Sequence, residues 1–136
     1  MQQTGSILII DNDSAIADLL VESLTDEGYV VYAAPDGADA LGAITCHPPA
    51  LIVLDVGHTG MRGVEVIEHV RQTLLATLPI VVTTTAPRCA TALLVSAAVE
   101  CLAKPFDLDD LFACVARYVQ LPTAVPASTI AAVAST

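Results

Sequence analysis

Short apolar runs alternate along the chain with longer segments in which apolar residues recur at helical spacing. The runs cover residues 7–10, 29–34, 51–54, 80–84 and 101–103. The helical patterns cover residues 16–24, 40–44, 66–74, 90–99 and 108–119. A uniformly apolar run of this length is typical of a parallel strand buried on both faces. Five strand–helix units therefore predict one α/β domain with a doubly wound parallel sheet.

Polar and turn residues mark the expected ends of the helices. Asp13 and Asp107 stand where an N-cap side chain is needed, and Gly28 stands at a C-cap position. The periodicity places Leu19 on the core face of the first helix and Val119 on that of the last.

The predicted domain covers residues 1–121, and the composition changes after it. Residues 122–136 contain Pro122 and Pro126 among small residues, with no charge and no aromatic ring. Such a segment is typical of a flexible tail or the stub of a linker. A short extra helix from Ser128 onward is the alternative.

The net charge of the chain limits the classes of molecule that it is expected to bind. The 136 residues carry Asp+Glu 15 against Lys+Arg 5, a formal net charge of −10. Residues 1–61 hold nine of the acids and no base, and Lys104 is the sole lysine. Nucleic acid and anionic membranes are bound through clustered Lys and Arg, so neither is expected as a partner. Cations and basic protein surfaces are the expected partners of so acidic a chain.

Nothing in the sequence predicts a membrane-spanning helix or a secreted protein with disulfide bonds. No apolar run reaches the ~18 residues that cross a bilayer, and the N-terminus lacks the basic and apolar regions of a signal peptide. The four cysteines form no CxxC pair. We therefore expect reduced cysteines and a cytoplasmic protein.

The predicted strands end in side chains that can bind ions. Asp11 follows the first strand, Asp55 the third, residues 83–85 (three threonines) end the fourth, and Lys104 follows the fifth. In an open parallel sheet, ligands bind at the carboxyl ends of the strands. Two neighbouring carboxylates repel unless a cation shares the site, and their oxygens suit Mg²⁺. A hydroxyl and an ammonium group beside them could hold phosphoryl oxygens.

In this order the motifs resemble the receiver (CheY-like) domain of two-component response regulators, over residues 6–120. The matching segments are residues 7–13 (ILIIDND), 51–55 (LIVLD), 60–63 (GMRG), 79–84 (PIVVTT) and 102–106 (LAKPF). The resemblance implies a flavodoxin-like (βα)5 fold with strand order 2-1-3-4-5. It also implies a regulatory phosphoacceptor rather than an enzyme.

The resemblance assigns a phosphorylation site and a metal site. Asp55 would accept a phosphoryl group from a sensor histidine kinase or a phosphotransfer protein. Magnesium would be held by Asp55, by Asp11 through water, by Asn12 and by the backbone carbonyl of Gly57.

The resemblance also assigns a switch. Thr84, chosen by counting from Pro79, would carry the switch hydroxyl, and Lys104 would contact a phosphoryl oxygen, with the peptide bond after it cis. Cys101 stands where receivers usually carry the aromatic residue that follows the switch. Residues 90–120 would form the output face, whose Ala, Val and Leu content favours a homodimer or a hydrophobic partner.

Two departures from the family pattern keep alternatives open. Asn12 replaces a usual aspartate, which predicts weaker magnesium binding and slower phosphorylation, and Cys101 is too small to move as an aromatic ring would. A degenerate receiver that binds a partner without phosphorylation is therefore one alternative. Asp13 could compensate for Asn12, although capping the first helix is the favoured role.

A second alternative is a haloacid-dehalogenase-like phosphatase, with Asp11 as nucleophile and Asp13 as acid/base. That fold needs another acidic pair after its fourth strand, and residues 85–99 contain no acid. This alternative also leaves Asp55 without a role.

Overall fold

The computed structural model describes residues 3–56, 63–72, 77–85 and 100–120. The predicted helix over residues 90–99 and the predicted tail over residues 122–136 lie outside these ranges. So does part of the expected output face.

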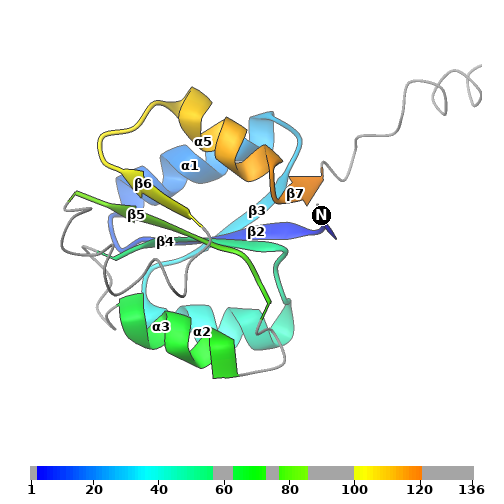
Figure 1. Ribbon diagram of the computed structural model, residues 1–136, viewed down its shortest axis with the longest axis vertical. Coiled ribbons are helices and arrows are strands. Elements are labelled where there is room, and N and C mark those ends of the chain that lie inside the picture. The colour runs from blue at the N-terminus through cyan, green and yellow to red at the C-terminus, as the bar shows by residue number, and fades with distance from the viewer. Residues whose placement is uncertain (1–2, 57–62, 73–76, 86–99, 121–136) are drawn as a thin grey trace, which may run out of the picture.

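The core of the domain is a five-stranded parallel sheet (Figure 1). Its strands are β2 (Ser6–Ile10), β3 (Val30–Ala34), β4 (Leu51–Asp55), β5 (Ile80–Thr84) and β6 (Glu100–Ala103). They are arranged in the order β3-β2-β4-β5-β6, and every pair is parallel. Counted along the chain within this sheet, the order is 2-1-3-4-5, so the predicted fold class is confirmed.

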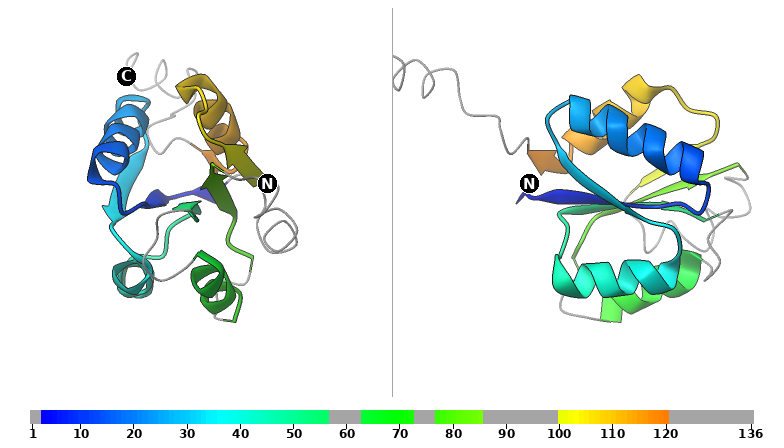
Figure 2. Two further views of the ribbon diagram at one scale, coloured as in Figure 1. Left: turned by 90° about the vertical axis from the view of Figure 1, so that its left-hand side faces the viewer. Right: turned by 180° about the vertical axis from the view of Figure 1, so that it is seen from behind.

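Helices cover both faces of the sheet (Figure 2). The helices α1 (Ser14–Asp26) and α5 (Leu108–Ala116) lie on one face, while α2 (Gly37–Cys46) and α3 (Gly63–Gln72) lie on the other. Successive side chains of a strand point to opposite faces. Ile7 and Ile9 of β2 accordingly join the core under α1 and α5, whereas Leu8 and Ile10 join the core over α2 and α3.

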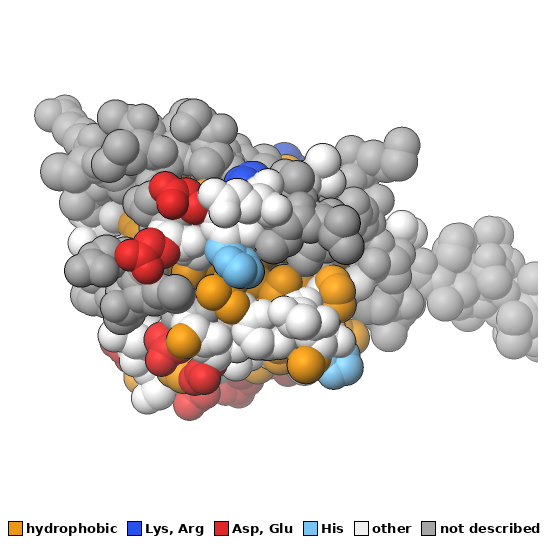
Figure 3. Space-filling model, turned by 90° about the horizontal axis from the view of Figure 1, so that it is seen from below, with side chains coloured by type: hydrophobic (Ala, Val, Ile, Leu, Met, Phe, Trp, Pro, Cys, Tyr) orange, Lys and Arg blue, Asp and Glu red, His pale blue; other side chains and the backbone are white. Residues whose placement is uncertain are grey.

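The face formed by α2 and α3 shows how the negative charge is distributed (Figure 3). Acidic side chains gather there toward the end of the molecule where the sheet strands finish, and hardly any basic side chain is visible. Asp39, Glu65 and Glu68 are among the exposed acids of these two helices. Negative charge therefore gathers on this face of the molecule near the edge of the sheet that holds the predicted site.

Burial on both faces is confirmed only for the central strands. Every residue of β4 and β5 is buried, and so are the last four residues of β2. The two edge strands are partly exposed, and Val30 of β3 is 58% exposed. The apolar composition of β3 therefore predicted a strand correctly, but it did not predict an edge position.

The first helix begins and ends as expected. The Asp13 carboxylate accepts hydrogen bonds from the backbone N–H groups of Ala15 (3.1 Å) and Ile16 (3.3 Å), which confirms its role as N-cap. Gly28 has φ 104°, a conformation that favours glycine, directly after the C-cap. Asp107 occupies the N-cap position of α5, but its side chain makes no capping hydrogen bond.

We expect Asp13→Ala to lower the free energy of unfolding by about 1 kcal/mol, because two N–H groups of the first turn lose their acceptor. Urea denaturation followed by circular dichroism measures this change. Asp107→Ala is the matched control, since Asp107 holds the same helix position without a capping bond. An equal loss of stability in both variants would contradict the prediction.

The end of the domain differs from the prediction. The last helix stops at Ala116, and Val119 belongs to a short strand, β7 (Val119–Gln120), which pairs in parallel with β1 (Gln3–Thr4). Val119 is buried in the core, as predicted, but from a strand. A single apolar position at the end of a helical pattern satisfies both structures, so the periodicity could not distinguish them.

No helix within the described residues is long and apolar enough to cross a membrane.

Candidate functional site

Three charged side chains meet at the carboxyl edge of the sheet. Asp11 directly follows β2, Asp55 is the last residue of β4, and Lys104 directly follows β6. β2 and β4 are neighbours in the sheet, while β6 lies two strands from β4. The long side chain of Lys104 spans β5 to reach both acids.

The ammonium group of Lys104 lies between the two carboxylates. Its Nζ atom is 3.3 Å from Oδ1 of Asp55 and 3.5 Å from Oδ2 of Asp11. Both aspartate side chains are 2% exposed, and that of Lys104 is 12% exposed. Because water is largely excluded, these charges interact more strongly than a surface ion pair would.

One ammonium group does not balance two carboxylates. Burial raises the pKa of Asp11, and the negative charge of Asp55 raises it further. A hydrogen bond from the backbone N–H of Asp13 (2.9 Å) and the charge of Lys104 oppose this shift without overcoming it. With both carboxylates ionised, the three side chains carry a formal net charge of −1, so the site favours binding of a further cation.

This donor set fits magnesium. Mg²⁺ is usually held by one or two carboxylates together with water and substrate oxygens. Asp11 and Asp55 supply two carboxylates at one edge of the sheet. Within the described residues, no cluster of three or more His, Cys, Asp or Glu side chains suggests a softer or fully protein-coordinated metal site.

The predicted switch residue lies on β5, the strand between those that carry Asp55 and Lys104. Thr84 is the last residue of β5 and is 3% exposed, and its carbonyl accepts a hydrogen bond of 2.7 Å from the backbone N–H of Lys104. Thr83 is in register with Asp55, and the following Thr85 is exposed. The peptide bond between Lys104 and Pro105 is cis, which confirms that prediction.

The remaining predicted site residues lie further out. Asn12 is exposed and, with Asp11, lines a hollow of about 160 Å³ beside β3. Cys101 of β6 is half-buried and packs on the core over α2 and α3, where burial raises the pKa of its thiol. Gly57 lies outside the described residues.

A second polar cluster, which no local pattern in the sequence predicts, joins the start of β6 to the end of α5. Glu100 accepts hydrogen bonds from the guanidinium of Arg117 and from the hydroxyl of Tyr118 (3.1 Å). Burial alone would raise the pKa of Glu100, but its hydrogen bonds with Arg117, Cys114 and Tyr118 lower it overall. Burial and the nearby carboxylate raise the pKa of Cys114 to about 12. This thiol is therefore a packing group.

The prediction that Leu19 faces the core is wrong, because this side chain is 51% exposed. Ala17, Leu20 and Leu24 are the fully buried residues of α1. The apolar arc of the helix is wider than its contact with the sheet. The apolar residue beyond this contact was the feature of the sequence that could have predicted a partly exposed apolar surface beside the site.

The fold and the site together define a class: a doubly wound α/β domain with two buried acids and a lysine at the carboxyl edge of its sheet. Comparison with known sequences then identifies the family. The sequence profile of the response regulator receiver domain matches residues 7–116, and the chain belongs to this family.

Individual relatives agree. The chain is 33% identical over 118 residues to the transcriptional regulatory protein KdpE of Mycobacterium tuberculosis, covering 87% of this chain and 52% of KdpE. It is 38% identical over 109 residues to the response regulator MprA of Mycobacterium sp. strain KMS, covering 79% of this chain and 47% of MprA. The chain thus spans about half the length of these curated relatives.

A solved structure of the Vibrio cholerae chemotaxis protein CheY4 has the same fold. It superposes with a TM-score of 0.77 at 28% identity, covering 86% of this chain and 100% of that protein.

Proposed function

We propose that this receiver domain accepts a phosphoryl group on Asp55 from the phosphohistidine of a sensor kinase or phosphotransfer protein. The observation that carries the proposal is the contact of one buried lysine with two buried carboxylates. Membership of the response regulator family supports it. The role is regulatory, and the modified domain signals by binding another protein.

The chemistry follows from the positions of the side chains. An oxygen of Asp55 forms a bond to phosphorus while the bond from phosphorus to the donor imidazole nitrogen breaks, and the imidazole takes a proton from solvent. A magnesium ion held at this site would supply positive charge to offset the negative charge of the phosphoryl oxygens. Asp11 and Asp55 would hold this ion, together with Asn12 and the Gly57 carbonyl. Most of the acceleration comes from placement and charge neutralisation.

Lys104 and Thr84 would recognise the product. Lys104 already lies 3.3 Å from Asp55, so its ammonium group can move to a phosphoryl oxygen with little rearrangement. Thr84 is joined to Lys104 through the backbone hydrogen bond, which gives the switch hydroxyl a connection to the same site. Residues 90–120 would carry the output. A switch by rotation of an aromatic ring is not available at Cys101, because a thiol side chain has no ring.

The test is labelling by a small phosphodonor. We expect incubation with acetyl phosphate and Mg²⁺ to add one phosphoryl group to the wild-type chain, and none to Asp55→Ala, as measured by intact mass. No label at any magnesium concentration would support a degenerate receiver instead. Hydrolysis of phosphate esters that requires Asp11 but not Asp55 would support a phosphatase.

Asn12 provides a separate prediction. An amide in place of a carboxylate removes one negative charge beside the metal site, so Mg²⁺ should bind more weakly. We expect Asn12→Asp to reduce the magnesium concentration for half-maximal labelling by about tenfold, on the order of 1.4 kcal/mol. Asn12 is exposed, so the folded state should tolerate the change. Identical magnesium dependence in both proteins would contradict the prediction.

A further inference from the structure

One edge of the sheet carries a strand that is paired on one side only. β3 lies at the end of the strand order, and within the described residues β2 is the strand that pairs with it. The backbone carbonyl of Ala34 in β3 accepts a hydrogen bond of 3.3 Å from the backbone N–H of Asp11, the residue after β2. Successive residues of a strand direct their N–H and C=O groups to opposite sides. The N–H and C=O groups of Val31 and Ala33 therefore point away from β2, and we call them the open edge of β3.

The open edge lacks the features that normally prevent a strand from pairing with another chain. Exposed edge strands are usually protected by a charge, a proline or a bulge. β3 contains no charged residue and no proline, and its register with β2 advances one residue at a time. Val30 is 58% exposed and Ala33 is exposed as well, whereas the other edge strand, β6, begins with the charged Glu100. The open edge can therefore accept an added strand.

A hollow beside the open edge can receive a side chain of such a strand. It has a volume of about 310 Å³ and is lined by Ser6, Val30, Tyr32 and His47. The hydroxyl of Tyr32 donates a hydrogen bond to the carbonyl of His47, which holds the ring beside the hollow. Peptides that add a strand to a sheet gain affinity from backbone hydrogen bonds and specificity from pockets for alternate side chains. The open edge and the hollow together provide both.

Acidic residues surround β3 at both of its ends. Asp26 and Glu27 end α1 shortly before β3 begins, and both are exposed. Asp36 and Asp39 begin α2 directly after β3. Residues 14–46 contain no lysine and no arginine. Positive side chains at the two ends of an added strand would therefore meet opposite charge at each end of β3.

We propose that the open edge of β3 binds an extended segment of another protein, with β-branched or aromatic residues at its centre and Lys or Arg at both ends. A second copy of this chain is disfavoured, because antiparallel pairing of two β3 strands would bring the acids at the start of one strand against those at the end of the other. The uncharged segment 121–136 would leave these acids without opposite charge. The interaction involves neither Asp55 nor phosphorylation, so it does not depend on the proposed function.

The probe is a synthetic peptide of about nine residues, with alternating β-branched and aromatic residues between two basic residues at each end. A matched peptide carries glutamate in place of the basic residues. Titration against the full chain, followed by amide chemical shifts, measures the affinity and the location of each peptide. We expect the basic peptide to bind along β3 at least about tenfold more tightly than the acidic one, and more weakly at high salt. Equal affinity for both peptides would overturn the proposal.

Hydrogen exchange tests whether the backbone groups of the open edge are used. The amide protons of Val31 and Ala33 should exchange quickly in the free chain and at least about tenfold more slowly when the basic peptide is bound. Protection of both amides in the free chain would show that the chain itself or a second copy already covers the edge, and the proposal would then fail.

Methylation of the peptide backbone provides a test that does not alter the protein. Only every second N–H of an added strand faces β3, and N-methylation removes this donor. We compare two basic peptides that are methylated at the two alternating sets of positions. One should bind at least about tenfold more weakly than the parent peptide, while the other should bind about as tightly. An equal loss of affinity in both peptides, or no loss in either, would contradict strand addition.

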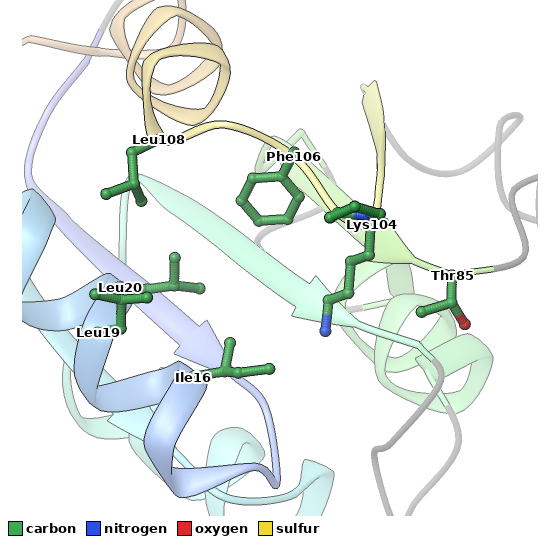
Figure 4. A pocket seen from close by; sticks show the side chains of 8 residues that line it. Ile16, Leu19, Leu20, Thr85, Lys104, Phe106 and Leu108 are labelled. Carbon is green, nitrogen blue, oxygen red and sulfur yellow. The ribbon is translucent and has the colours of Figure 1, made fainter.

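Two variants with the same charge change locate the interface. Val30→Lys places a positive charge beside the hollow, so it should weaken binding of the basic peptide by about tenfold or more. Leu19→Lys is the control, since Leu19 is 51% exposed but lines a different hollow, beside Lys104 at the carboxyl end of the sheet (Figure 4). Equal effects of the two variants would place the peptide elsewhere and overturn the proposal.

Discussion

Replacing Lys104 by methionine should lower the free energy of unfolding by about 3 kcal/mol at pH 8 in metal-free buffer, because two buried carboxylates lose the ammonium group that lies between them. The loss should shrink as the pH falls, since the pKa of Asp11 is raised by burial and a proton taken up by this carboxyl then replaces the ammonium charge. Millimolar Mg²⁺ should restore part of the stability by binding the folded state. Urea denaturation at several pH values measures all three effects.

The same variant should be labelled by acetyl phosphate about a hundredfold more slowly than wild type, since one positive group that stabilises the transferring phosphoryl oxygens is absent. Arg117→Met is the control. It removes the same charge from a side chain that is 53% exposed in its ion pair with Glu100, where water screens the interaction and the expected loss of stability is much smaller. A Lys104→Met protein that matches this control in stability at pH 8 would contradict the buried three-residue cluster.

Replacing Asp11 by asparagine should have the opposite effect on stability. The pKa of Asp11 is raised in the folded chain, chiefly by burial, so its ionised form opposes folding above that pKa. We therefore expect Asp11→Asn to be more stable than wild type at pH 7.5 without metal. The difference should fall as the pH drops through the folded-state pKa, because wild-type Asp11 then becomes neutral, and should vanish below the unfolded value of about 3.9.

The stabilised variant should nevertheless be a poorer phosphoacceptor. Loss of one of two carboxylates weakens magnesium binding, so labelling at 1 mM Mg²⁺ should fall by about tenfold or more and recover in part at higher concentration. The Asp13→Ala variant provides a comparison, because it alters the neighbouring helix cap and leaves both carboxylates in place. Stability of Asp11→Asn that follows the wild-type pH profile would rule out the raised pKa.

The accuracy of the sequence-based predictions depended on how local each feature is. The strands were found because runs of at least three consecutive apolar residues bounded by polar or turn residues favour a buried strand. The Asp13 cap was found because its hydrogen bonds reach only two and three residues ahead. Val119 was assigned to a helix, since only the pairing with β1, more than a hundred residues away, makes it a strand residue. Leu19 was assigned to the core because its spacing fits the apolar face of the helix, whereas the tertiary packing leaves it 51% exposed.

The sequence by itself determined the alternation of strands and helices, the excess of acid, and the polar residue that follows each central strand. Those properties depend on the spacing and chemistry of neighbouring residues, which the chain states directly. Only the tertiary structure decided that the ammonium group of Lys104 lies between Asp55 and Asp11. The strand before Lys104 is two strands away from that of Asp55 and three strands away from that of Asp11. It also decided that half of Leu19 remains exposed beside them. The order of strands in the sheet sets both, because distances across a sheet are fixed by topology rather than by separation along the chain.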